Sequence, residues 1–132
     1  MKMPESWTAG LKWLLVAIVI SSILHYVDNL LYFEEYPEPP WINRSMVDAF
    51  WFFMTPLAWI GYQLMRRGRH HSGTLVLLAF TACNLFTLGH YQFAPMHSIG
   101  ARIHFFILLE AALASLLAIF LCAYYAKRAL EK

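Results

Sequence analysis

Charged residues are scarce in this chain. Only 14% of its 132 residues are Asp, Glu, Lys or Arg, whereas an ordinary soluble domain has about a quarter. Hydrophobic residues make up 60% of the chain and aromatic residues 17%. A small soluble domain does not bury that much apolar surface, so the composition excludes this class and indicates a membrane protein.

Cysteines are also few, and the sequence has no internal repeat and no nucleic-acid motif. Its two cysteines, Cys83 and Cys122, fall at different depths of predicted helices, which argues against a disulfide between them. The net charge of +2 is spread over short loops. We therefore expect no nucleic-acid partner.

Four long apolar runs account for most of the chain. They lie at about 10–33, 47–66, 74–92 and 101–125, and each is about long enough to cross a hydrocarbon core of about 30 Å as a helix. The connecting segments are too short to form another domain, so residues 1–132 are expected to be one membrane domain. Short loops make sequential helices antiparallel. The predicted fold is all-α, a four-helix transmembrane bundle with up-down-up-down topology.

Basic residues are distributed unevenly between the two ends of this bundle. One end carries Lys2, Lys12, Arg66, Arg67, Arg69, Lys127, Arg128 and Lys132. The other end carries only Arg44 and Arg102. The positive-inside rule therefore predicts an integral, multi-pass protein with cytoplasmic N- and C-termini. The turn RRGRHHSG is expected to be an orientation signal at the lipid headgroups, with a metal or phospholipid site as the alternative.

Polar side chains gather in the half of the bundle away from the basic loops. A charged side chain is costly in a bilayer unless it faces protein, water or a partner, so this placement is informative. Helical spacing puts Ser21, Ser22, His25, Asp28 and Asn29 on one face of the first span, and Cys83, Asn84, Thr87 and His90 on one face of the third. Asp48, His104 and Glu110 lie at similar depths on the other two spans. We expect the stripes to face each other or the bundle interior and to form a polar pocket.

The pocket residues favour acid–base chemistry on a small hydrophobic or amphipathic molecule delivered by the membrane lipid. Imidazole titrates near neutral pH, and a neighbouring carboxylate makes an acid–base pair able to shift a double bond or open a ring. The predicted catalytic residues are His25, Asp28, Asp48 and Glu110. The predicted ligand contacts are Asn29, Trp51, Asn84, His90 and His104. For each histidine, a structural hydrogen bond between helices is the alternative. This interpretation requires no cofactor.

A family resemblance covers about a third of the chain. The segment from EPPWI through VDAFWFFMTPLAW to RRGRH resembles the second-helix region of the EXPERA family, the emopamil-binding sterol isomerases and sigma-2-type receptors, which have four or five membrane helices. The resemblance implies that Asp48 stands where the family has a ligand-contacting glutamate, and Pro56 at its helix kink. His25 and Asp28 are similar to a family His and Asp, at a shorter spacing. Nothing in the fourth span matches.

Two other functions fit the same residues. His25, Asp28, His90 and His104 could bind a transition metal in a redox enzyme or metal carrier, although the His-x-x-x-His and Glu-x-x-His pairs of helical metal sites are absent. The chain could also be a non-catalytic assembly subunit, including a homodimer, whose polar groups fix helix pairing. The loop EEYPEPPWIN is either a rigid turn anchored in the headgroups or a lid over the pocket.

Overall fold

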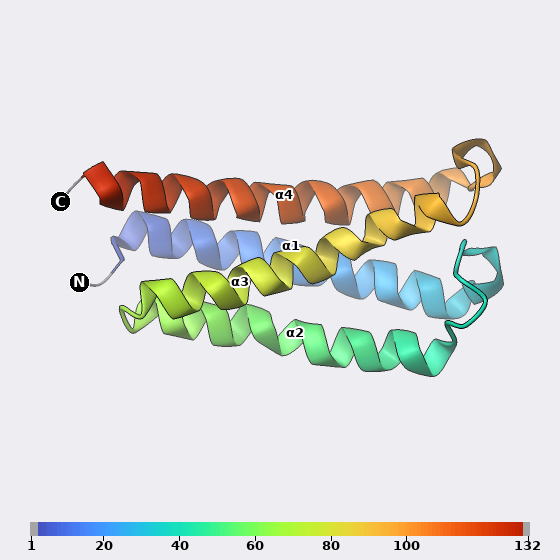
Figure 1. The fold of residues 1–132 in the computed structure, drawn as a ribbon, viewed down its shortest axis with the longest axis horizontal. Helices are drawn as coiled ribbons and strands as arrows, with labels where there is room; N and C mark the ends of the chain where they lie inside the picture. The colour runs from blue at the N-terminus through green and yellow to red at the C-terminus, as the bar shows by residue number, and fades with distance from the viewer. Residues whose placement is uncertain (1–2, 131–132) are drawn as a thin grey trace.

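The computed structural model describes residues 3–130. Its main elements are four long helices. The helices are α1 (Glu5–Leu31), α2 (Arg44–Arg66), α3 (His70–Leu85) and α4 (Ala101–Leu130). Short 3-10 helices extend α3 as η2 (Phe86–Gln92) and occupy the two longer loops as η1 (Phe33–Glu35) and η3 (Met96–Ser98). Both chain ends and the α2–α3 turn lie at one end of an antiparallel bundle (Figure 1). The predicted all-α bundle is confirmed.

Three helical segments within residues 3–130 are long and apolar enough to cross a membrane. These are α1, α3 together with η2 (His70–Gln92), and α4. They indicate an integral, multi-pass membrane protein. The fourth predicted span, 47–66, is not among them, although α2 has 23 residues and packs within the bundle. Ser, Thr, Gln, Trp and Tyr residues interrupt its apolar run and lower its hydropathy.

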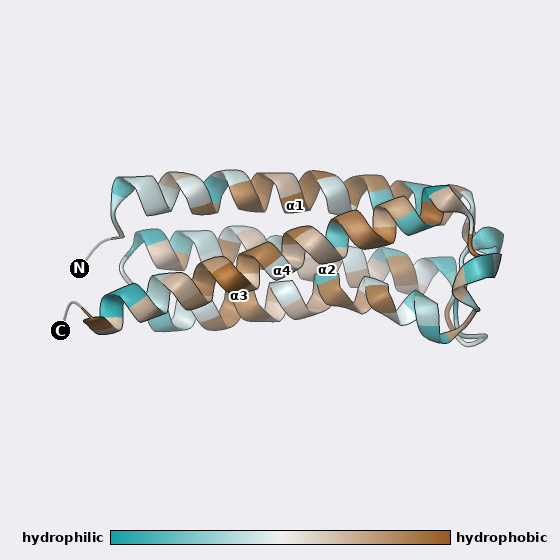
Figure 2. Ribbon diagram, turned by 90° about the horizontal axis from the view of Figure 1, so that it is seen from above, coloured by the Kyte–Doolittle hydropathy of each residue, from teal (hydrophilic) through white to brown (hydrophobic). Residues whose placement is uncertain are grey.

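The half of the bundle that contains the chain ends has an apolar core, which we call the apolar half. Its buried residues are Met3, Leu11, Leu15, Ile18, Ala58, Met65, Leu77, Phe80, Leu117, Leu121 and Tyr124. Glycines bring α2 and α3 into close contact, since a Cβ at Gly61 would lie 2.6 Å from Leu77 Cδ2, and one at Gly73 would lie 2.9 Å from the Met65 backbone nitrogen. Figure 2 shows the hydrophobic middle of the helices and the polar residues at their ends.

The other half of the bundle, which we call the polar half, opens between two helices. α3 crosses the bundle obliquely, so that η2 lies near α4 and away from the start of α2 (Figure 1). α2 continues through Pro56 as one helix. The five predicted polar residues of α1 are all buried, as are Asn84 and Thr87 from the predicted stripe on the third span. The prediction that both stripes face inward is confirmed for these residues.

Candidate ligand-binding site

A cavity of about 450 Å³ lies in the polar half; we call it the ligand cavity. Small-molecule sites usually have volumes of about 300–1,000 Å³. Its apolar wall includes Trp41, Phe50, Trp51, Met54, Phe86 and Phe93. Its polar lining includes Ser22, His25, Tyr26, Asn29, Glu38, Thr87, His90 and Glu110. The lining also includes Cys83 of α3, and the other residues come from α1, α2, η2, α4 and the loops, so the cavity depends on the whole bundle.

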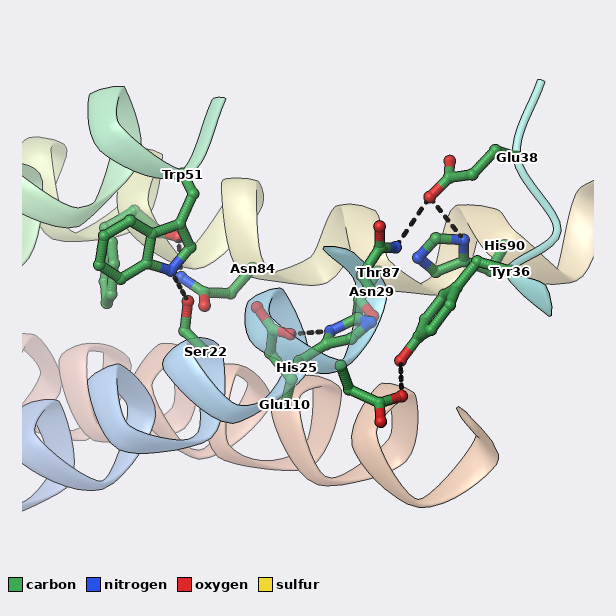
Figure 3. A network of polar contacts seen from close by, with 12 residues as sticks. Ser22, His25, Asn29, Tyr36, Glu38, Trp51, Asn84, Thr87, His90 and Glu110 are labelled. Atoms are coloured by element: carbon green, nitrogen blue, oxygen red, sulfur yellow. Dashed lines mark hydrogen bonds and ion pairs between the residues drawn. The ribbon is translucent and has the colours of Figure 1, made fainter. Parts of the chain in front are cut away.

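A buried His–Glu pair forms one side of the ligand cavity. His25 Nδ1 hydrogen bonds with Glu110 Oε2, and the Thr87 hydroxyl lies 3.3 Å from the same nitrogen (Figure 3). His25 Nε2 is buried and has no hydrogen-bond partner within residues 3–130. A carboxylate at one imidazole nitrogen fixes the ring and favours protonation at that nitrogen, which leaves the other nitrogen as an acceptor. This arrangement can supply a general base.

A second polar group holds the α1–α2 loop against the ligand cavity. Asn29 Nδ2 donates to Glu38 Oε1 at 3.0 Å, and His90 Nδ1 lies 3.6 Å from that oxygen and 3.2 Å from the Pro37 carbonyl oxygen (Figure 3). Asn29 Oδ1 is buried without a partner within residues 3–130. Glu38 is not among the predicted site residues. The sequence placed Glu38 only in the proline-rich loop. A loop has no helical period from which the direction of a side chain could be predicted.

Asp28 lies outside the ligand cavity and joins three segments. The Tyr36 hydroxyl donates to Asp28 Oδ2 at 2.7 Å, while Arg102 Nε lies 3.0 Å from Asp28 Oδ1. Arg102 Nη2 also donates to Glu35 at 2.7 Å. Burial, and then the hydrogen bond to Asp28, raises the pKa of Tyr36 above the usual tyrosine value. The predicted catalytic residue Asp28 thus has partners that hold the loop to α1 and α4.

Three more predicted site residues are also outside the cavity lining. Asp48 accepts a hydrogen bond from the hydroxyl of Tyr26, which does line the cavity. Asn84 is fully buried and donates to the Phe80 carbonyl oxygen at 2.8 Å. His104 contacts the Tyr91 hydroxyl and the Met96 carbonyl oxygen, both at 2.9 Å. The predicted residues that do line the ligand cavity are His25, Asn29, Trp51, His90 and Glu110.

The residues predicted for a metal site do not form one. Within residues 3–130, no group of three or more His, Cys, Asp or Glu side chains is placed to hold a metal ion. The rings of His25 and His90 are neighbours, with centroids 5.7 Å apart, but Asp28 pairs with Arg102 and His104 with Tyr91. The geometry therefore does not assemble the transition-metal site that the alternative interpretation requires.

Known proteins provide no template for this site. Comparisons with protein-family models, with curated proteins and with solved structures found no match. The function must therefore be inferred from the cavity and from the polar groups that line it.

Proposed function

We propose that this membrane protein binds a small amphipathic molecule in the ligand cavity, with the polar group of the molecule at His25. The observation that carries the proposal is a buried imidazole whose Nδ1 is held by Glu110 and whose Nε2 has no hydrogen-bond partner within residues 3–130. Buried polar atoms in proteins are nearly always paired, so an unpaired one beside a cavity favours a missing partner. The aromatic wall suits an apolar ligand body.

The polar group of the ligand is proposed to be a hydrogen-bond donor. Two of the unpaired buried atoms within residues 3–130 belong to residues that line the cavity, and both of these, His25 Nε2 in its neutral form and Asn29 Oδ1, are acceptors. The lining of the ligand cavity, as described within residues 3–130, contains Glu38 and Glu110 but no Lys or Arg. A hydroxyl or ammonium group satisfies these acceptors, whereas a carboxylate or phosphate would be repelled. This preference agrees with the sterol or amine ligands that the EXPERA resemblance implies.

The chemistry proposed for this site is a double-bond shift by proton transfer. With the ligand hydroxyl on Asn29 Oδ1, the imidazolium form of His25, paired with the Glu110 carboxylate, gives its Nε2 proton to one carbon of the double bond. The neutral Nε2 then removes a proton from a carbon on the other side of the cationic centre, so the product is an isomer and no oxidant or reductant is consumed. The hydrogen bond between His25 and Glu110 supports a catalytic role for these two residues. Asp28 and Asp48 are less suited to such a role, because they are hydrogen bonded to Tyr36 and Tyr26.

We also propose that α2 is a fourth span and that the end with the basic residues is cytoplasmic. The charged residues of α2 are Arg44, Asp48 and Arg66, which lie near its two ends, where they can reach the headgroups. The asymmetry of basic residues supports this orientation. Reporter fusions at the C-terminus and in the loop at 93–100 test it, because the two positions should report opposite sides.

Ligand-dependent thermal stability in detergent tests the binding proposal. A sterol alcohol and a long-chain amine should raise the melting temperature of the wild-type protein, whereas a fatty acid should not. His25→Phe should reduce the effect of the alcohol, because it removes the imidazole nitrogen that accepts from the ligand and keeps a ring of similar size. Asp48→Asn is the matched control: Asp48 lies outside the lining, the amide oxygen of Asn can still accept the hydrogen bond from Tyr26, and the effect should be kept. Equal stabilisation by the fatty acid, or equal loss in both variants, would overturn the proposal.

The chemistry needs a separate readout. Incubation of the protein with an unsaturated sterol, followed by chromatography of the extracted sterol, should reveal an isomer of unchanged mass. If the sterol binds but no isomer forms, the site is a binding site only. Elemental analysis of the purified protein tests the metal alternative, which predicts stoichiometric metal that is lost in His90→Ala and His104→Ala variants.

A further inference from the structure

A second cavity lies at the opposite end of the bundle, and we call it the basic cavity. Its volume is about 490 Å³, and it lies between the α2–α3 turn and the last turns of α4. Its lining includes Arg69, His71, Ser72, Tyr125 and Arg128. The ligand cavity uses none of these residues, so the two sites can be tested separately.

The basic cavity carries positive charge without matching acid. Arg69 and Arg128 form no ion pair with a carboxylate within residues 3–130. The lining described within the same residues contains no Asp or Glu. Two guanidinium groups at one hollow, with an imidazole beside them, suit the oxygens of a phosphate group.

The backbone adds donors to the same cavity. Gly68 has a φ of 78°, a left-handed conformation that glycine adopts readily, and it lets the chain turn from α2 into α3 within a few residues. α3 begins at His70, and Arg69 provides no side-chain hydrogen bond to cap it. The first N–H groups of a helix have no partner within that helix and attract anions. His70, His71 and Ser72, the first residues of α3, all line the cavity.

An apolar surface continues from the basic cavity along the helices toward the middle of the bundle. Helical spacing puts Leu75 and Leu78 on the same face of α3 as His71, and their side chains are 56% and 40% exposed. On α4, Tyr125 lines the cavity and the exposed Cys122 lies one turn further from the end. Both helices are candidate membrane spans. A charged hollow joined to an exposed apolar surface matches a lipid better than a free ion.

We propose that the basic cavity binds the phosphate group of an anionic phospholipid whose acyl chains lie against α3 and α4. Basic hollows between membrane helices are suited to acidic headgroups. Arg69 and Arg128 contact the phosphate oxygens from opposite sides of the hollow, and the N–H groups at the start of α3 donate to it. The proposal does not depend on the ligand cavity or its chemistry.

Native mass spectrometry of the full chain in maltoside micelles tests the proposal, with phosphatidylglycerol and phosphatidylcholine added in turn. The wild-type protein should retain about one phosphatidylglycerol and much less phosphatidylcholine. Arg69→Gln with Arg128→Gln should weaken phosphatidylglycerol binding about tenfold or more, because two charged contacts are lost. Arg66→Gln with Arg67→Gln is the matched control: it removes equal charge from the same turn, outside the lining, and should weaken binding less than about threefold.

Several results would overturn this assignment. Equal loss in the two double variants would mean that general surface charge attracts the lipid. Equal retention of phosphatidylcholine would contradict selection of an acidic headgroup. Thermal stabilisation by inorganic phosphate alone, lost in the lining variant and without lipid retention, would identify a free-phosphate site. If the lining double variant does not fold, Arg128→Gln alone provides the test, with an expected loss of about threefold.

Discussion

The apolar half and the polar half of the bundle are built from the same helices but packed in different ways. In the apolar half, α1 and α4 bury Leu11, Ile18 and Leu121, and the buried hydroxyl of Tyr124 is hydrogen bonded to His70. In the polar half, the same two helices bury His25 and Glu110 beside a cavity. An unpaired buried polar atom costs about 1–3 kcal/mol, so the polar half gives up stability that the apolar half supplies. Such a division is typical of a protein whose binding region is supported by a rigid core.

The largest effect is expected from a cavity made in the apolar half. Leu77 is fully buried and contacts the α2 helix at Gly61. Leu77→Ala should lower the free energy of unfolding by about 2–4 kcal/mol, because the removed methyl groups leave a void. Thermal or denaturant unfolding in detergent measures it. Leu75→Ala, at an exposed position of the same helix, should change stability by less than about 0.5 kcal/mol. Equal losses would show that this half is not closely packed.

The second prediction concerns the polar half and its proposed chemistry. Glu110→Gln preserves the shape of the side chain and removes the carboxylate that stabilises an imidazolium at His25. The rate of isomerisation should fall about 100-fold, while binding of the sterol alcohol should change little. Isomer formation at saturating sterol measures the first effect and thermal shift the second. Asp48→Asn should leave both close to wild type. An unchanged rate in Glu110→Gln would remove Glu110 from the mechanism.

The sequence predicted the helices and the inward faces of this bundle because both depend on local spacing. Hydrophobic runs located all four helices to within several residues, and the period of the helix placed His25 and Asn29 on a buried face. It did not predict the partners of those faces. Asp28 pairs with Arg102 from 74 positions away, so it is not available to the ligand cavity. Helical spacing predicts the face of the helix on which a side chain lies and its depth in the bundle. Which partner the side chain meets depends on how the two helices are rotated relative to each other and on the path of the connecting loop.

Loop residues were the least predictable part of the site. Glu38 reaches both Asn29 and His90, although the loop sequence indicated only stiffness from its prolines. His104 lies at the depth expected for the pocket, but η2 and η3 bring Tyr91 and Met96 to it instead. The fourth span stays a prediction at α2, since this helix packs in the bundle but is not among the three segments apolar enough to be candidate spans within residues 3–130.

A smaller effect on stability is expected from loss of the hydrogen bond between Tyr36 and Asp28 in the polar half. Tyr36→Phe removes the hydroxyl that donates to Asp28 and should lower the unfolding free energy by about 1 kcal/mol. Tyr32→Phe, in the same loop and exposed, is the control. Because folding raises the pKa of Tyr36, its stabilising contribution is complete below the unfolded tyrosine pKa of about 10 and is lost as the pH rises above it. The wild-type protein should thus lose more stability above that pH than Tyr36→Phe. A parallel loss in both would contradict this assignment.

The last effect, which decides the role of the loop, is expected on a rate and comes from Glu38. Glu38→Ala removes the contacts with Asn29 and His90 and should lower the unfolding free energy by about 1 kcal/mol. If the loop is a lid, bound ligand should dissociate about fivefold faster, because an opening step limits release. Exchange of a fluorescent sterol measures this rate, with Glu34→Ala as the control from the exposed part of the same loop. An unchanged rate in Glu38→Ala would show that the loop is a rigid turn. The ligand would then reach the cavity between α2 and η2, where the centroids of the exposed rings of Phe50 and Phe86 lie 6.1 Å apart.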